Sequence, residues 1–175
     1  MENMIEFLKT RRSIRKFQDR PVEEEKIEAL MKAALLAPSS KSSRPWHFVV
    51  VDDKEKLQKM AESREMGSQF LSGAPLAVLV LAEEKKSNVW VEDCSIAALL
   101  IQLAAHDLGL GSCWVQVRNR IKEEGVSTEN FLKEVFEVPE GMKMECIIGI
   151  GYKDEEKRPV DEAKLLMDRV HRNKF

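Results

Sequence analysis

Apolar side chains recur along the chain with two different periods, one typical of helices and the other of strands. Between Pro21 and Pro38 they are spaced by three and four residues, as in a helix with one buried face. These apolar residues are Ile27, Leu30, Met31, Ala34 and Leu35. The helix must end near Pro38, because proline disfavours helical geometry in the residue that precedes it. A shorter helix is predicted over residues 3–10.

Four apolar stretches are predicted to be strands. "WHFVVV" at 46–51 is rich in β-branched and aromatic residues and stops at two aspartates. "PLAVLVLA" at 75–82 is continuously apolar, as expected for a strand that is covered on both faces. The other two strands are "GSCWVQV" at 111–117 and "MECIIGIGY" at 144–152.

Helices are predicted between these strands, over residues 53–63, 92–108 and 129–136. The segment 92–108 is apolar nearly all round, which favours a central buried helix. Asp93 lies near its start and Gly109 just past its end, as helix-terminal residues should. The order of elements indicates an α+β or α/β fold, in which helices pack on one layer of sheet.

The chain is predicted to be one domain, residues 1–175, because no repeat or flexible linker divides it. Residues 153–175 form a long polar tail after the last strand. Four apolar residues of this tail still need a partner surface: Leu165, Leu166, Met167 and Val170. We therefore expect a C-terminal arm that wraps another subunit.

Composition narrows the classes of protein that remain. Of the 175 residues, 43% are hydrophobic and 33% charged, and the net charge is -2, so no overall field attracts nucleic acid or an anionic membrane. The longest apolar stretch, residues 96–105, is too short to span a bilayer, and the acidic start "MENMIEFLKTRR" does not resemble a signal peptide. Cys94, Cys113 and Cys146 are isolated in apolar runs and are expected to be reduced core residues. A cytoplasmic location is therefore expected.

A basic run, "TRRSIRKF", follows the first helix and is the first candidate for chemistry. Arginine guanidinium groups match phosphate oxygens, and a serine hydroxyl adds a compact donor. In an extended segment, Arg11, Ser13 and Arg15 would project to one side, while Ile14 and Phe17 would face apolar packing. The structural alternative is a solvated helix end, where cations favour the C-terminal dipole.

Two further segments have a possible binding role. "APSSKSSRPW" makes a serine-rich turn whose hydroxyl and amide groups are suited to a polar heterocycle or a phosphate, although it also fits an ordinary helix-to-strand connection. In "AAHDLGLGSCWVQV", Gly109 and Gly111 permit a tight turn and the close approach of a flat ligand, or simply cap the helix.

Side chains for conventional catalysis are scarce. His47, His106 and His171 lack the spacing of metal ligands, His106 falls in a helix that is mostly core, and no nucleophile or metal motif occurs. We therefore expect no metal site and no catalytic side chain. An enzyme with these features would need an organic cofactor for its chemistry.

Together, "RRSIRKF", "APSSKSSRPWHFVVV", "EDCSIAALLIQLAAHDLGLGSCWV" and "IIGIGY" resemble the nitroreductase family of FMN-dependent oxidoreductases. The motifs occur in the family's order from about residue 5 to 152. The resemblance implies an α+β sandwich with a mostly antiparallel central sheet and a C-terminal arm exchanged in a homodimer. It also implies FMN sites at the subunit interface, with NAD(P)H as the electron donor.

The same resemblance suggests which residues contact FMN. The phosphate and ribityl part would be bound by the basic run, and Lys157 or Arg158 would complete the phosphate site. The partner subunit would line the flavin with its serine-rich turn, and the strand after "GLGS" would pass near the isoalloxazine ring. The cofactor-binding candidates are Arg11, Arg12, Ser13, Arg15, Pro38, Ser39, Ser40, Ser42, Trp114, Val115, Gln116, Lys157 and Arg158.

This sequence also departs from the family pattern. Ser42 stands where the family often has asparagine, and Arg44 where it often has glutamine. Arg44 is therefore a candidate for binding an acidic substrate or the phosphate of NADPH, with simple exposure as the alternative. Only about ten residues, "EEKKSNVWVE", occupy the place where larger relatives insert a lid.

The function favoured by these observations is transfer of electrons from NAD(P)H through flavin N5 to a nitroaromatic, a quinone or another small acceptor, by a ping-pong mechanism. Three alternatives remain. They are a specialised relative that dehalogenates its substrate or fragments flavin, a flavin-binding redox sensor or FMN carrier without efficient turnover, and an anion-binding protein without flavin.

Overall fold

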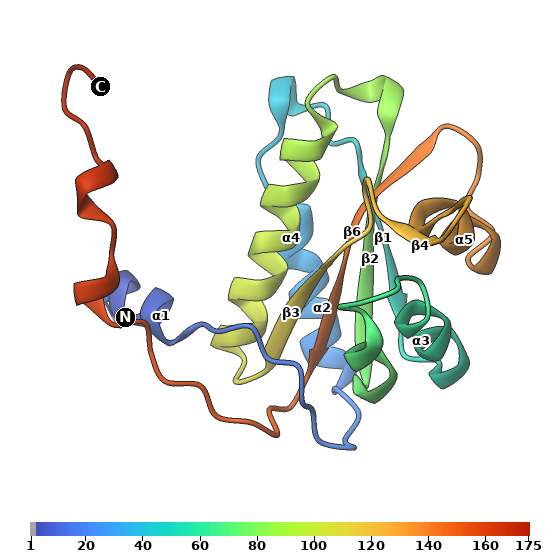
Figure 1. Ribbon diagram of the computed structural model, residues 1–175, viewed down its shortest axis with the longest axis horizontal. Helices are drawn as coiled ribbons and strands as arrows, with labels where there is room; N and C mark the ends of the chain where they lie inside the picture. Colours follow the sequence, from blue (N-terminus) through green and yellow to red (C-terminus); the bar gives the residue numbers. More distant parts are fainter. Residues whose placement is uncertain (1–2) are drawn as a thin grey trace.

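Within residues 3–175, four strands form one antiparallel sheet at the centre of the protein (Figure 1), in the order β1-β2-β6-β3. They are β1 (Trp46–Val51), β2 (Leu76–Glu83), β3 (Gly111–Gln116) and β6 (Met142–Gly151). The computed structural model describes residues 3–175. The central strands β2 and β6 are buried almost throughout, as the continuous apolar run at 75–82 predicts.

Within residues 3–175, five α-helices occur at the places that the apolar spacing predicts; the first has no buried residue and lies away from the sheet (Figure 1), and the other four pack on the sheet and its edges. They are α1 (Met4–Thr10), α2 (Glu24–Leu35), α3 (Lys54–Ala61), α4 (Trp90–Asp107) and α5 (Thr128–Val135). Short 3-10 helices occur at Ser40–Ser42, Gln69–Gly73, Glu84–Lys86, Glu162–Lys164 and Met167–Arg169. The predicted α+β fold with an antiparallel sheet is confirmed.

The alternating side chains of the strands divide the core into two apolar layers. Val78 and Val80 of β2 face α2 and α4, where Leu30 and Ile101 are fully buried. Leu79, one position along, faces the opposite layer, which contains residues of α3 and α5. The sheet is therefore packed between two layers of helices.

Two details differ from the sequence expectations. A hairpin of β4 (Ile121–Glu123) and β5 (Val126–Ser127) was not predicted, because such short charged strands show no apolar alternation. The helix α4 is buried on one face only, since Ile96 and Leu99 keep 39% and 47% of their surface exposed in the single chain.

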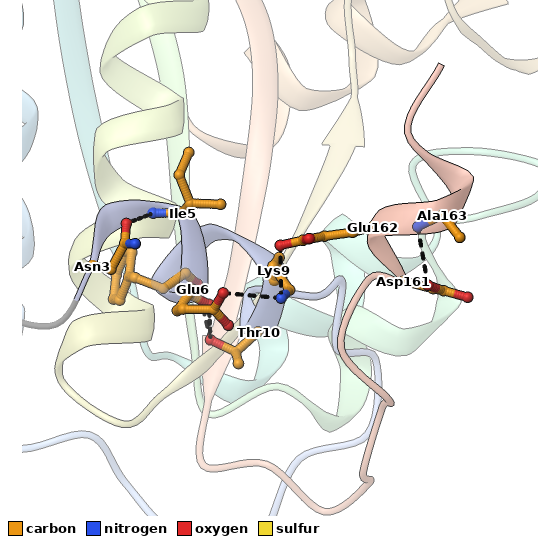
Figure 2. A network of polar contacts seen from close by, with 9 residues as sticks. Asn3, Ile5, Glu6, Lys9, Thr10, Asp161, Glu162 and Ala163 are labelled. Carbon is orange, nitrogen blue, oxygen red and sulfur yellow. Dashed lines mark hydrogen bonds and ion pairs between the residues drawn. The ribbon is translucent and has the colours of Figure 1, made fainter. Parts of the chain in front are cut away.

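The C-terminal arm leaves the sheet and runs beside α1 (Figure 1). Lys9 of α1 is joined to the arm by an ion pair with Glu162 at 3.1 Å, and it also pairs with Glu6 of its own helix at 3.0 Å (Figure 2). The Val160 amide also donates to the Lys9 carbonyl. Beyond these contacts the apolar side chains of the arm are exposed: Leu165, Leu166, Met167, Val170 and Phe175.

Two expectations from the composition concern the cysteines and the absence of a membrane-spanning helix. All three cysteines are free and buried, as predicted. Within residues 3–175, no helix combines the length and the apolar character needed to cross a bilayer.

Candidate functional site

The basic run takes an extended course directly after α1. The helix ends at Thr10, whose hydroxyl donates to the Phe7 carbonyl at 2.9 Å, and Arg11 is already in an extended conformation. The Ile14 amide then donates to the Ser112 carbonyl at 3.0 Å, and the Ile14 side chain is buried. The run is therefore fixed against the start of β3, and Ile14 packs in the core as its position predicts.

The two glycines of the turn before β3 are explained by local packing. Gly109 has a φ of +77°, the left-handed conformation of a residue that follows a helix. A Cβ at Gly111 would lie 2.8 Å from the Ile14 side chain. Gly109 therefore ends the helix, as the structural alternative predicts, whereas Gly111 leaves room for the buried Ile14 side chain at the start of β3.

A cavity of about 590 Å³ opens between the basic run, the end of α4 and the segment that follows β6. Among its wall residues are four cations, Arg11, Arg12, Lys153 and Lys157. Its other walls are Thr10, Ile14, His106, Leu110, Ser112, Asp154, Glu155 and Glu156. The tertiary structure thus joins the N-terminal basic run to Lys157, as the resemblance implies.

One carboxylate in this cavity already occupies donors suited to an anion. Glu155 Oε1 accepts from the amides of Arg15, 2.6 Å, and Lys16, 3.3 Å, while its Oε2 lies 2.8 Å from Lys157 Nζ. The Arg15 amide and then the Lys157 ammonium lower the pKa of this carboxyl group. Two adjacent amides and a cation therefore hold an oxyanion here.

His106 belongs to the cavity, although the sequence indicated a helix that is mostly core. Its Nε2 lies 2.9 Å from Thr10 Oγ1, and its ring stacks at a tilt on Phe7 with centroids 4.7 Å apart. Burial, and next the nearby Lys153 ammonium, lower the pKa of the His106 imidazole. No spacing in the sequence links His106 or Lys153 to the basic run, because the contacts join segments far apart in the chain.

The other candidates for the phosphate site differ in whether they reach the cavity, and of these Arg12 is a wall residue. The Arg12 guanidinium donates to the Arg158 carbonyl, and the Arg158 side chain is exposed. Arg15 is exposed as well, and Ser13 forms an isolated bridge with Ser112. Arg15, Ser13 and Arg158 are not among the cavity walls.

The serine-rich turn has an unusual backbone and is held by a buried acid. Lys41, Ser42 and Arg44 have φ values of 52°, 53° and 45°, in the left-handed region that side chains rarely adopt. The Ser40 amide donates to Asp93 Oδ1 at 2.8 Å, and Asp93 is only 3% exposed. Strained backbone of this kind is typical of functional sites.

Other contacts in this turn are local. The Ser39 hydroxyl accepts from the Arg44 amide at 3.0 Å, whereas Pro38, Ser42 and the Arg44 side chain are exposed. The turn therefore presents polar groups outward from a fixed base.

Within one chain, the turn and the basic cavity lie far apart. Asp93, which holds the turn, is in the first turn of α4, and His106 is in its last turn. At 1.5 Å per residue these positions are separated by about 20 Å along the helix. The structure therefore does not bring Pro38, Ser39, Ser40 and Ser42 to the cavity of their own chain.

The predicted flavin-lining strand, β3, lies at the edge of the sheet beside β6. Trp114 and Gln116 are half-buried, and the indole Nε1 donates to Gln116 Oε1 at 2.9 Å. The Val115 side chain is buried in the layer of α3 and α5, so only its backbone is available at the edge. Because β3 is an edge strand, half of its backbone groups point away from the sheet.

Comparison with known proteins identifies the family. The sequence model of the Nitroreductase family matches residues 8–67 and 56–152. An FMN-dependent nitroreductase from Clostridium difficile R20291 has the same fold, with a TM-score of 0.97 and 53% sequence identity over 98% of this chain and 100% of that one.

Two curated relatives match this chain over most of their own length and most of its length. A protein of Archaeoglobus fulgidus, described as a candidate NADH dehydrogenase or NAD(P)H nitroreductase, is 41% identical over all of both chains. An iodotyrosine deiodinase of Thermotoga neapolitana is 26% identical over 90% of this chain and 92% of that protein. The resemblance drawn from the sequence motifs is confirmed. The chain belongs to the nitroreductase family.

Proposed function

We propose that this protein is an FMN-dependent oxidoreductase that transfers electrons from NAD(P)H to a small acceptor, such as a nitroaromatic or a quinone, by a ping-pong mechanism. The observation that carries the proposal is the cavity where Arg11, Arg12, Lys153 and Lys157 meet at the start of β3. The C. difficile relative, named as FMN-dependent, supports the cofactor, and the A. fulgidus relative supports the donor.

The residues of this cavity fit the phosphate of FMN. Guanidinium and ammonium groups form strong charge-assisted hydrogen bonds with phosphate oxygens. The amides of Arg15 and Lys16 already hold a carboxylate of the same chain, Glu155, so the donor geometry suits an oxyanion. The three carboxylates in the walls leave a small excess of positive charge.

When bound, FMN supplies the chemistry that this chain lacks, accepting a hydride at N5 and delivering electrons to the second substrate. The chain's own part is to bind and orient. The basic cavity would hold the phosphate end, and the free backbone edge of β3 at Trp114, Val115 and Gln116 would lie beside the ring. No side chain is required as a nucleophile or as a metal ligand.

We also propose that the functional unit is a homodimer with its FMN sites at the interface. The 20 Å between the serine-rich turn and the basic cavity supports this, because a complete site needs the turn of a second subunit. The exposed apolar side chains of the arm, together with Ile96 and Leu99 on α4, are suited to the interface. The assembly would act in the cytoplasm.

The first experiment is an absorbance spectrum of the protein purified without added cofactor. Flavin bands that bleach when NADH or NADPH is added without oxygen, and return with menadione or nitrofurazone, are the expected result. Bound flavin that neither nucleotide bleaches would favour the redox sensor or FMN carrier. A colourless protein that does not take up FMN would contradict the proposal.

A second candidate function is reductive dehalogenation, favoured by the iodotyrosine deiodinase relative. In this version the exposed Arg44 guanidinium would bind the carboxylate of an acidic substrate. Release of iodide from iodotyrosine by the flavin-loaded protein and NADPH, and its loss in Arg44→Gln, would support it.

A further inference from the structure

Glu145 is a buried acid that the proposed chemistry does not use. It lies on β6 and is only 4% exposed. In the pairing of β2 with β6, Val80 faces Cys146 and the next residue, Leu81, faces Met144, so Glu145 has no partner on β2. It is therefore the extra residue of a β-bulge, a feature that commonly redirects a side chain.

Within residues 3–175, the carboxyl group of Glu145 forms a hydrogen bond with one side chain. Its Oε1 accepts from Gln116 Nε2 at 3.2 Å, whereas Oε2 is buried without a hydrogen-bond partner among the described residues. An ionised carboxylate in this state would lose its hydration with little in return.

The charged and titratable groups around Glu145 do not offset the cost of burying its carboxylate charge. Burial raises the pKa of its carboxyl group, and Glu92 on α4 adds to the increase, while Gln116 and Arg118 oppose it. The thiols of Cys94 and Cys146, which also lie beside it, are themselves held neutral because burial raises their pKa. Glu145 therefore stays protonated to a higher pH than an ordinary glutamate.

The Trp114 indole, the Gln116 amide and the Glu145 carboxyl group form a chain of hydrogen bonds in which donors and acceptors are fixed. An indole nitrogen can only donate, so Gln116 must present its oxygen to Trp114 Nε1, at 2.9 Å. Its amide nitrogen is then directed to Glu145 Oε1 and, at 3.4 Å, to the Arg118 carbonyl. Glu145 thus provides the nearer acceptor for the Gln116 amide nitrogen in the orientation that the indole requires.

We propose that Glu145 is a positioning residue that, through the side chain of Gln116, holds the Trp114 indole in place on β3. The consequence for activity rests on the proposed function, in which this part of β3 lies beside the flavin. A loosened indole there would disturb the orientation of the ring or of the acceptor without removing any group that reacts.

Two variants of similar volume separate positioning from a purely structural role. Glu145→Gln keeps an oxygen that can accept from Gln116, whereas Glu145→Leu removes the acceptor and also removes the unpartnered buried oxygen. Replacing both partners of a buried hydrogen bond by apolar groups is often neutral for stability, whereas removing one partner destabilises the fold if the other is left unsatisfied. Glu145→Gln should therefore keep the thermal midpoint, and Glu145→Leu should fold with a modestly lower one, because the Gln116 amide nitrogen still has the Arg118 carbonyl as an acceptor.

The first readout needs no flavin. In ¹H–¹⁵N spectra, the Trp114 indole resonance, assigned with Trp114→Phe, should be retained in Glu145→Gln and displaced or broadened in Glu145→Leu. In the unmodified protein this resonance should shift with pH, with a midpoint above that of an ordinary glutamate, and the shift should vanish in Glu145→Gln. An indole resonance that is the same in all three proteins and independent of pH would overturn the proposal.

The second readout uses the FMN-loaded protein. Glu145→Leu should slow anaerobic reduction by NADH about fivefold, the usual effect of one lost hydrogen bond, and Glu145→Gln should restore the rate. Equal losses in both variants would overturn the positioning role. If the protein binds no FMN, the proposed function fails, but the indole measurement still decides the role of Glu145.

Discussion

Replacing Arg11 by alanine is the most direct way to test whether the basic cavity binds phosphate. Arg11 lines the cavity and is followed by an extended segment that Ile14 anchors in the core. Its side chain is partly exposed and is not part of the buried core. The substitution should therefore remove a cation from the cavity without disturbing the fold.

The expected loss follows from the type of interaction. A hydrogen bond to a charged group contributes about 1.5 to 3 kcal/mol, and each 1.4 kcal/mol changes a dissociation constant about tenfold. Arg11→Ala should thus weaken FMN binding about tenfold to hundredfold. Lys157→Ala, another wall residue of the cavity, should have a smaller effect of the same kind, because the ammonium group of this lysine is already paired with Glu155.

The assay is quenching of FMN fluorescence on addition of flavin-free protein, repeated at low and high salt. Lys54→Ala is the matched control, because this lysine is 89% exposed on α3 and lies outside the cavity. The control should bind FMN like the unmodified protein, and all proteins should unfold at similar temperatures. A double variant, Arg11→Ala with Lys157→Ala, whose dissociation constant stays within about twofold of the unmodified protein would refute the reasoning.

Three other predictions concern the Glu23 carboxyl group, the packing at Gly111 and the C-terminal arm. The Tyr152 hydroxyl donates to Glu23 at 2.5 Å and is the largest cause that lowers the pKa of this glutamate to about 2, so Tyr152→Phe should raise that pKa when measured by NMR. A carboxyl group whose pKa is lowered by folding stabilises the protein at a pH above its ordinary pKa, and this stabilisation is lost as the pH falls through the lowered pKa. The free energy of unfolding of Tyr152→Phe should therefore decrease less than that of the unmodified protein between about pH 4.5 and 2. Gly111→Ala should destabilise the protein by about 1 to 3 kcal/mol in denaturant unfolding, because the new Cβ collides with Ile14, and an unchanged midpoint would contradict this packing. Deleting residues 161–175 should convert a dimer to a monomer of roughly half the mass in light scattering, whereas an unchanged mass would show that the arm is not needed for association.

The sequence by itself determined the elements and the family. Apolar spacing located the five α-helices and the four strands of the main sheet, because a buried face imposes its period on the local sequence. Four motifs in the family's order, from the basic run at Arg11 to "IIGIGY", together identified the family, and each could be recognised because it is a continuous segment. The sequence did not predict the β4–β5 hairpin, because these two short strands contain no buried residue and therefore show no apolar spacing.

Only the tertiary structure decided which distant residues share a site. Pairing of the basic run with the start of β3 brings Arg11 to His106 and Lys153, and the length of α4 keeps the serine-rich turn away from them. A register shift of one residue between β2 and β6 leaves Glu145 without a partner and directs it to Gln116. Contacts of this kind depend on strand order and register, which long-range packing sets and which no local pattern of residues records.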